Sequence, residues 1–226
     1  MRTSPVHDCL SRLGTVWGTL NGMPIARAIP GPTTTTLALF DLSALHRTGL
    51  KGPGAASWLQ TRNLAVPERA NAWLDLAGGG LIARLGRGEF LIEDGLHGRD
   101  VEGITDALAT PAANVYPVLR QDAALMIRGE ALYELLAQTC SIDLSAAALE
   151  ERTVSLTMMA GIAVTLVDVS SAHAAPCFRV WCDGTYGAYL WETLLEIAVE
   201  LGGGAAGLEA IYPDLARSGS NESNQP

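Results

Sequence analysis

The stretch that decides the fold is Gly79-Gly80-Leu81-Ile82-Ala83-Arg84, followed by Leu85-Gly86-Arg87-Gly88 and then by Glu89-Phe90-Leu91-Ile92-Glu93. Two apolar runs flank a short segment that contains two glycines. Apolar runs of this length on either side of a glycine-containing turn are typical of two adjacent strands. Residues 79–93 are therefore predicted to form a strand, a turn and a second, antiparallel strand.

A weak internal duplication organises the sequence around this segment. Leu50-Lys51-Gly52 opens a segment that ends in Trp58-Leu59, and Ile127-Arg128-Gly129 opens one that ends in Leu135-Leu136. Both pairs of anchors are 77 positions apart (129 − 52 and 136 − 59). Each segment has an apolar residue, a cation, a glycine and an apolar pair in the same order, which predicts a strand, a tight turn and a helix.

The duplication continues through two further strand pairs and a closing helix in each half. The expected pairs are residues 80–85 with 161–166, residues 90–92 with 178–180, and the helices 99–109 and 186–201. Because the strands would meet as hairpins and not through regular crossovers, the predicted class is α+β. We expect two pseudo-repeated halves, each an antiparallel sheet with helices.

Breaks in the pattern suggest boundaries within one structural unit. We expect an N-terminal extension at residues 1–36, a first half at 37–110, a second half at 111–217 and a disordered tail at 218–226. Residues 111–117 carry two prolines and an asparagine, which suits a connector. The first dozen residues and residues 31–36 are expected to be loosely held.

Composition excludes several classes of function. The 226 residues are 48% hydrophobic, which is enough for a core, and the net charge of −9 with a pI near 4.8 argues against nucleic acid as a partner. The first ten residues lack the apolar core of a secretory signal, so we expect a cytoplasmic protein. The most apolar run, residues 158–167, is too short to span a bilayer and is predicted to be a buried strand. No membrane segment is expected.

The sequence lacks the usual motifs of catalytic and metal-binding residues. The cysteines Cys9, Cys140, Cys177 and Cys182 have no CxxC spacing, and the histidines His7, His46, His97 and His173 fall in different segments. Cys177 and Cys182 are expected on opposite faces of one strand. We therefore predict structural thiols, no metal site and no activated nucleophile.

Two glycine-rich segments superficially resemble nucleotide-binding loops. Residues 202–207 match GxGxxG, but a predicted helix precedes them where the motif needs a strand, so a helix cap and loop are expected. In residues 49–54, Lys51 precedes the glycine turn and no Ser or Thr follows to hold magnesium. A strand-to-helix turn, with Pro53 near the start of the helix, is the better interpretation.

The last long helix places three acidic residues along one line. Glu192, Glu196 and Glu200 follow i, i+4, i+8 spacing, with Trp191 beside them. Like charges at this spacing destabilise an isolated helix by roughly 0.2–0.5 kcal/mol per pair. A solvated acidic face is the main interpretation, and a contact strip for a basic partner surface is the alternative.

Three ordered segments resemble the N-terminal, folate-binding domain of the glycine cleavage T-protein, an aminomethyltransferase. They are residues 40–43 (Phe-Asp-Leu-Ser), residues 50–59 and residues 79–82. In that family the last strand continues into an Asp that acts on the folate-bound one-carbon unit. Here the positions hold Ala83 and Arg84. Neither side chain can act as a carboxylate does, and the resemblance implies the fold without this acid.

The second half departs from the T-protein pattern as well. A Gly-Tyr-Thr-Gly-Glu type segment near the folate is replaced by Val167-Asp168-Val169-Ser170-Ser171-Ala172. The additional C-terminal barrel of full-length aminomethyltransferases is also expected to be missing. With both halves altered, Arg84 is interpreted as a structural or interface cation.

A narrower likeness covers about residues 40–201. The sequence resembles the γ subunit of heterotetrameric sarcosine oxidase, and the segments that carry this likeness are residues 84–91, 127–129, 135–136, 140–144, 178–180 and 189–195. The resemblance implies a noncatalytic companion of the α, β and δ subunits, in a complex that demethylates sarcosine to glycine and passes the carbon to tetrahydrofolate. FAD, FMN, NAD and tetrahydrofolate would be held by the partner subunits.

Two alternatives remain at this point. The first is a subunit of a related N-methyl amino acid dehydrogenase, for example one acting on N-methylglutamate. A stand-alone folate-dependent transferase would need another carboxylate, such as Asp41 or Asp168. Cofactor-binding residues of this chain are not predicted.

Overall fold

A computed structural model of the protein describes residues 2–31, 36–145, 151–171 and 174–218. The chain forms two compact units. Unit 1 comprises Met1–Ala44, Asp122–Leu149 and Leu156–Pro226, and unit 2 comprises Leu45–Gln121 and Glu150–Ser155. These units and the predicted half-repeats divide the chain differently. The predicted tail at 218–226 lies, apart from residue 218, outside the described residues.

Unit 2 is built on a five-stranded antiparallel sheet in the order β5-β6-β7-β4-β8. Its elements are β4 (Arg47–Lys51), α2 (Ala55–Gln60), β5 (Ala72–Leu76), η1 (Ala77–Gly79), β6 (Gly80–Arg84), β7 (Glu89–Glu93), α3 (Asp100–Leu108) and β8 (Tyr116–Val118). The decisive stretch forms the expected hairpin, with Ile82 opposite Ile92 and Arg84 opposite Phe90. Helices α2 and α3 contribute to a core with one face of this sheet, formed by Leu50, Ala55, Leu59, Ile82, Phe90, Ile92, Val101, Ile104 and Val115.

Unit 1 contains a six-stranded sheet in the order β10-β11-β12-β9-β3-β13 and a two-stranded sheet of β1 and β2. Its elements are α1 (His7–Ser11), β1 (Val16–Leu20), β2 (Met23–Ala28), β3 (Ala38–Asp41), β9 (Ala123–Arg128), α4 (Leu132–Thr139), β10 (Val154–Met159), β11 (Ile162–Asp168), β12 (Cys177–Cys182), η2 (Gly184–Tyr186), α5 (Gly187–Glu200), β13 (Gly204–Ala205), η3 (Leu208–Ala210) and α6 (Asp214–Ser218). Its core joins α1, α4 and α5 to one face of the six-stranded sheet through side chains such as Leu10, Leu135, Leu194, Ile127 and Phe178. The α+β class is confirmed.

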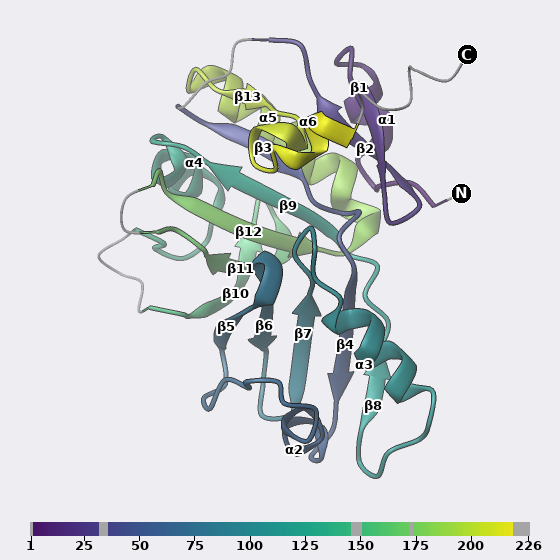
Figure 1. Cartoon of the computed structure of the whole chain (residues 1–226). Coiled ribbons are helices and arrows are strands. Elements are labelled where there is room, and N and C mark those ends of the chain that lie inside the picture. The colour runs from purple at the N-terminus through teal and green to yellow at the C-terminus, as the bar shows by residue number, and fades with distance from the viewer. Residues whose placement is uncertain (1, 32–35, 146–150, 172–173, 219–226) are drawn as a thin grey trace, which may run out of the picture. The chain divides into compact units, whose positions relative to one another are not determined.

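The two large sheets repeat one strand order. In unit 2 the order is β5, β6, β7, β4 and then β8, and in unit 1 it is β10, β11, β12, β9 and then β3. The fifth strand is exchanged between the halves. Strand β3 directly precedes β4 in sequence but pairs with β9, whereas β8 directly precedes β9 but pairs with β4 (Figure 1). This exchange explains why the compact units do not follow the linear halves.

Two glycines at equivalent positions make room for the exchanged strands. Gly52 follows β4 and Gly129 follows β9. Their φ angles are 127° and 149°, which residues other than glycine rarely adopt. A Cβ on Gly52 would collide with the backbone of Asn114, just before β8, and one on Gly129 with the backbone of Thr36, just before β3. The predicted strand-to-helix turns are confirmed, and their glycines are required by the close approach of a second backbone.

Two expectations about local structure are wrong, those for the first dozen residues and for residues 158–167, and the connector expected at 111–117 is shorter than predicted. The first dozen residues include α1, where Val6 and Leu10 are fully buried in the unit 1 core, so that non-local packing holds this short helix in place. The connector at 111–117 leads into β8, an edge strand in which Pro117 is tolerated. Residues 158–167 form parts of two strands, because Ala160 and Gly161, with φ angles of 50° and 80°, make a turn between β10 and β11.

Arg84 ties the end of β6 to two neighbouring loops. Its guanidinium donates hydrogen bonds to the carbonyl oxygens of Pro67 (3.0 Å), Glu68 (2.7 Å), Gly86 (3.3 Å) and Arg87 (2.6 Å). The guanidinium carbon also lies 5.5 Å from the centre of the Phe90 ring. The interpretation of Arg84 as a structural cation agrees with these contacts.

A buried ion pair lies on the other face of the same sheet. Arg47 Nε is 2.9 Å from Glu93 Oε2, and the two side chains are 1% and 0% exposed. These residues are register partners on β4 and β7. A buried pair contributes little net stability relative to apolar side chains, but each charge depends strongly on the other.

Replacing Arg84 with Ala is expected to lower the free energy of unfolding by about 3 kcal/mol, because several loop carbonyls lose a charged donor. Arg84→Lys should recover part of this loss. Urea denaturation measures both effects, and Arg87→Ala, an exposed neighbour, serves as the control with a change within about 0.5 kcal/mol. Equal effects at positions 84 and 87 would contradict the role assigned to Arg84.

Replacing Glu93 with Gln should cost about 3–5 kcal/mol of stability, since Arg47 keeps its charge without the carboxylate. The double variant Arg47→Met/Glu93→Leu should recover most of that loss, because both charges leave the interior together. Thermal and urea unfolding of the two variants provide the test. A double variant as unstable as Glu93→Gln would show that the pair has a role beyond mutual compensation.

Candidate functional site

Ala83 occupies the position where the resemblance would place an acid. It is fully buried on β6, opposite Leu91 of β7. Glu93 lies opposite Leu81, so Ala83 and Glu93 share a face of the sheet and are diagonal neighbours. Sequence reasoning gave Glu93 no role. Its carboxylate is, however, held by Arg47, and the pair has the geometry of a structural ion pair and not of a proton donor open to substrate.

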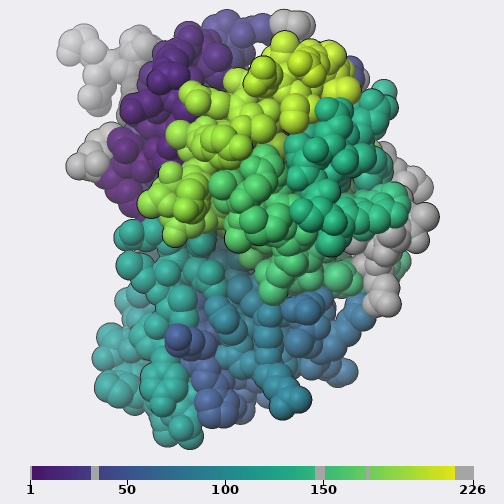
Figure 2. Space-filling view, turned by 180° about the vertical axis from the view of Figure 1, so that it is seen from behind, coloured from purple at the N-terminus to yellow at the C-terminus, as the bar shows by residue number. Residues whose placement is uncertain are grey.

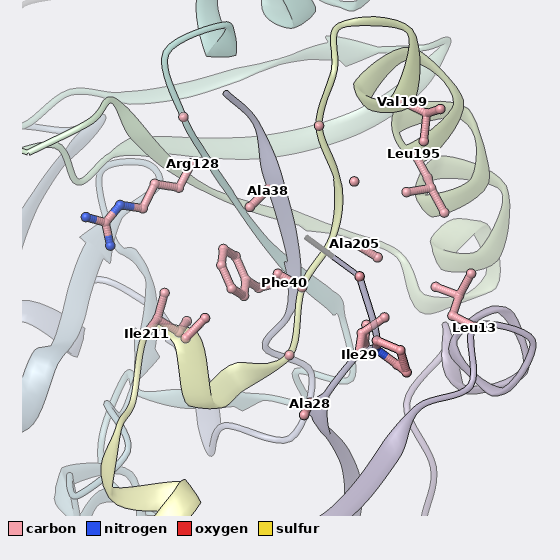
Figure 3. Close-up of a pocket in the computed structure, with 18 of the residues that line it drawn as sticks. Leu13, Ala28, Ile29, Ala38, Phe40, Arg128, Leu195, Val199, Ala205 and Ile211 are labelled. Carbon is pink, nitrogen blue, oxygen red and sulfur yellow. The ribbon is translucent and has the colours of Figure 1, made fainter. Parts of the chain in front are cut away.

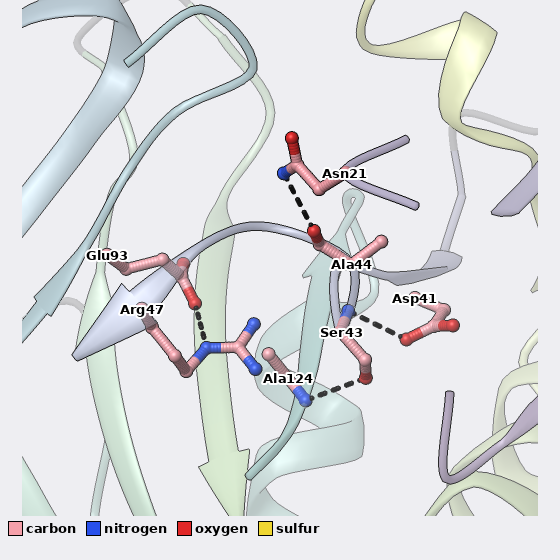
Figure 4. A network of polar contacts seen from close by, with 7 residues as sticks. All are labelled: Asn21, Asp41, Ser43, Ala44, Arg47, Glu93 and Ala124. Atoms are coloured by element: carbon pink, nitrogen blue, oxygen red, sulfur yellow. Dashed lines mark hydrogen bonds and ion pairs between the residues drawn. The ribbon is translucent and has the colours of Figure 1, made fainter. Parts of the chain in front are cut away.

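Asp41 organises the turn after β3. Its Oδ1 accepts a hydrogen bond from the Ser43 N–H (2.9 Å), and Ser43 Oγ accepts one from the Ala124 N–H (3.1 Å) (Figure 4). The Asn21 side chain donates to the Ala44 carbonyl (2.9 Å) in the same network. Asp41 is 6% exposed. The Phe-Asp-Leu-Ser motif thus fixes the end of β3 against the start of β9.

Asp168 lies at the end of β11, and its Oδ1 accepts from the Ser170 N–H (2.8 Å). Strands β9 and β12 separate β11 from β3. Three strand spacings place Asp168 about 14 Å from the Asp41 strand, too far for the two carboxylates to act on one group. The structure does not bring these candidates together.

Asp94 is a buried carboxylate at the start of α3. Its Oδ1 accepts hydrogen bonds from the N–H groups of Asp100 (3.1 Å) and Val101 (3.3 Å). Burial raises the pKa of the Asp94 carboxyl above its ordinary value. The carboxylate satisfies free N–H groups of the first helical turn, which accounts for its position without a catalytic role.

The thiols and histidines are dispersed. All four cysteines are free, and Cys177 and Cys182 lie at the two ends of β12. Burial raises the pKa of each of these two thiols to about 11, which disfavours the reactive thiolate. His7 stacks on Trp17 at 4.4 Å, and His173 lies outside the described residues. Within the described ranges, no group of three His, Cys, Asp or Glu side chains is arranged to hold a metal.

The glycine-rich segment after α5 is a helix cap, as expected. Gly202 has φ +80°, its N–H donates to the Val199 carbonyl, and the Gly203 N–H donates to the Ala198 carbonyl (2.7 Å). This pair of bonds defines a Schellman motif. Beyond the cap, Gly204–Ala205 form β13, parallel to β3, where a loop was predicted.

The acidic face of α5 is exposed on the surface of unit 1. The Glu192 carboxylate is 3.0 Å from the Arg12 guanidinium, and the N-terminal segment lies beside α5 (Figure 2). Trp191 is fully buried in the core. It therefore does not contribute to a contact strip, contrary to the expectation that favoured a partner there.

Unit 1 holds a cavity of about 560 Å³ at the β13 end of its sheet. Its wall on one side of the glycine-rich segment is formed by Leu13, Ile29, Leu195 and Val199 (Figure 3). The wall on the other side is formed by Ala38, Phe40 and Ile211. Arg128 and Glu209 are its charged lining residues among those described. Sequence reasoning did not find this cavity, because its walls come from six separate stretches of the chain.

No helix in the described part of the chain is long and apolar enough to cross a membrane. The described carboxylates singled out above stabilise turns, a helix start or an ion pair. The cavity is the feature with the size and lining of a small-molecule site.

Comparisons with solved structures show relatives of this fold. Aminomethyltransferase T of the glycine cleavage system from Bartonella henselae aligns with a TM-score of 0.70 and 16% identity, over 92% of this chain and 60% of its own. A chain of heterotetrameric sarcosine oxidase from Corynebacterium sp. U-96, in complex with pyrrole 2-carboxylate, aligns with a TM-score of 0.65 and 18% identity, over 88% of this chain and 96% of its own. This chain thus spans about 60% of the aminomethyltransferase.

Comparison with curated protein sequences gives no match. The family model of the GCVT N-terminal domain matches residues 31–213, which include both large sheets and the helices α2 to α5. The predicted relationship to the T-protein fold is confirmed. The chain belongs to the GCVT N-terminal domain family.

Proposed function

We propose that this chain is a noncatalytic γ-type subunit of a heterotetrameric sarcosine oxidase. The observation that carries the proposal is that the structural alignment with a chain of such an enzyme covers most of both chains, 88% of this chain and 96% of the other. The two chains are therefore similar in length as well as in fold. The aminomethyltransferase, by contrast, extends well beyond the matched region.

The geometry around β6 supports a role without catalysis. Ala83 is buried and has no functional group, and the Arg84 guanidinium is engaged by backbone carbonyls. Asp41 and Asp168 each hold a local turn. In this proposal the complex oxidises sarcosine to glycine and transfers the carbon to tetrahydrofolate, while α, β and δ subunits hold FAD, FMN, NAD and the folate.

The same subunit role fits a complex that oxidises another N-methyl amino acid, such as N-methylglutamate. The residues of this chain do not select the amine, because in either case the substrate site belongs to a partner. A stand-alone transferase is less well supported, since the carboxylates it would use are separated and committed to turns.

Co-expression tests the proposal. The tagged chain is produced with α, β and δ chains of a heterotetrameric sarcosine oxidase, and the products are analysed by size exclusion with light scattering. A 1:1:1:1 complex that oxidises sarcosine or N-methylglutamate is expected. An αβδ assembly that forms and turns over normally while this chain elutes alone would contradict the proposal.

Two conservative variants test the absence of catalysis within that complex. Asp41→Asn and Asp168→Asn keep the oxygen that accepts from Ser43 or Ser170 and remove the charge. Turnover should stay within about twofold of wild type, whereas loss of a general acid or base costs about 100-fold or more. A loss of that size in either variant, with assembly intact, would assign catalysis to this chain.

A further inference from the structure

We propose that the cavity in unit 1 binds a small molecule with an apolar body and a single anionic group. The inference rests on the cavity alone and holds whether or not the chain is an oxidase subunit. Its volume of about 560 Å³ lies within the range of roughly 300–1,000 Å³ that is usual for small-molecule sites.

The apolar body of the ligand follows from the cavity walls. Aliphatic side chains of Leu195 and Val199 on α5 face the cavity together with Leu13 and Ile29, and the Phe40 ring lies on the opposite side (Figure 3). Val199 is 60% exposed. Apolar surface that is open to water in a concave site favours an apolar occupant.

The cavity exists because the segment beside it carries few side chains. Gly203 and Gly207 cannot accommodate a Cβ, which would collide with the backbone of Leu37 and of Arg27. A Cβ on Gly204 would meet nothing within 4 Å, so this position opens onto free space. The chain is thus held against its neighbours on one side and leaves volume on the other.

The backbone of β13 adds polar groups to this apolar site. The N–H groups of Gly204 and Ala206 donate to the Leu37 and Leu39 carbonyls of the β3 strand. By strand alternation, Ala205 directs its own N–H and C=O away from β3, on the side where the described sheet ends. A bound ligand can be oriented by these two groups.

The anionic group follows from the balance of charge at the lining. Glu209 Oε2 lies 4.0 Å from Arg27 Nη1, so a cation already offsets its charge. Arg128 lines the cavity, and its guanidinium makes no hydrogen bond or ion pair within the described part of the chain. Figure 3 shows the guanidinium on the Phe40 side of the cavity, pointing away from Leu195 and Val199. Among the described lining residues, Arg128 is thus a cation without an ion-pair partner, and arginine binds carboxylate and sulfonate-type oxygens well.

The test uses two fluorescent probes with the same aromatic character. 1-Anilinonaphthalene-8-sulfonate is an apolar monoanion, and N-phenyl-1-naphthylamine is its neutral counterpart. Titration of the folded full chain should show one saturable site for the anion. Arg128→Gln should weaken anion binding about tenfold, the usual contribution of a charged hydrogen bond, and change binding of the neutral probe less than about twofold.

Two variants that fill the cavity complete the design, and circular dichroism verifies that each is folded. Gly204→Leu and Val199→Trp should each abolish binding of both probes. Arg12→Gln, an exposed arginine outside the cavity lining, is the matched control and should leave both affinities unchanged. The proposal would be overturned if the wild-type chain bound neither probe or if binding survived both filling variants. It would also be overturned if Arg12→Gln and Arg128→Gln weakened anion binding equally.

Discussion

The structure depends on the close approach of an exchanged strand to a glycine in each half of the chain. Gly52 and Gly129 sit where a second backbone passes, that of residue 114 before β8 and that of residue 36 before β3. Their positive φ angles also set the turn from strand to helix. Each sheet therefore receives its fifth strand from the other half of the chain. This exchange interlocks the two halves, although each sheet has its own core.

The contacts that hold β6 in place do not require a carboxylate at position 83, where Ala83 is fully buried. At the end of β6, Arg84 binds the carbonyls of two loops, and Arg47 with Glu93 forms a buried ion pair on the face shared by Ala83. The charged groups here are engaged in structural contacts. The subunit role that we propose would need such structural contacts and no acid at this position.

Much of the fold could be predicted from local pattern. The hairpin at 79–93, the 77-residue duplication and the helix α5 follow from apolar periodicity and glycine placement, and all are present. The exchange of β3 and β8 was not predictable, because strand pairing is decided by partners distant in sequence. For the same reason α1 was missed: five residues carry little helical signal, and burial of Leu10 in the tertiary core holds them.

The site was less predictable than the fold. The absence of an acid at positions 83–84 is visible in sequence, but the pairing of Glu93 with Arg47 and the cavity around β13 arise only from tertiary contacts.

The most direct test of the interlocked scaffold is the stability of Gly129→Ala compared with Gly204→Ala, whose new Cβ meets open space. Gly129→Ala should lose about 3 kcal/mol or more, and Gly204→Ala less than about 1 kcal/mol. Equal losses would contradict the account, because the close approach at Gly129 would then not be what holds the exchanged strand.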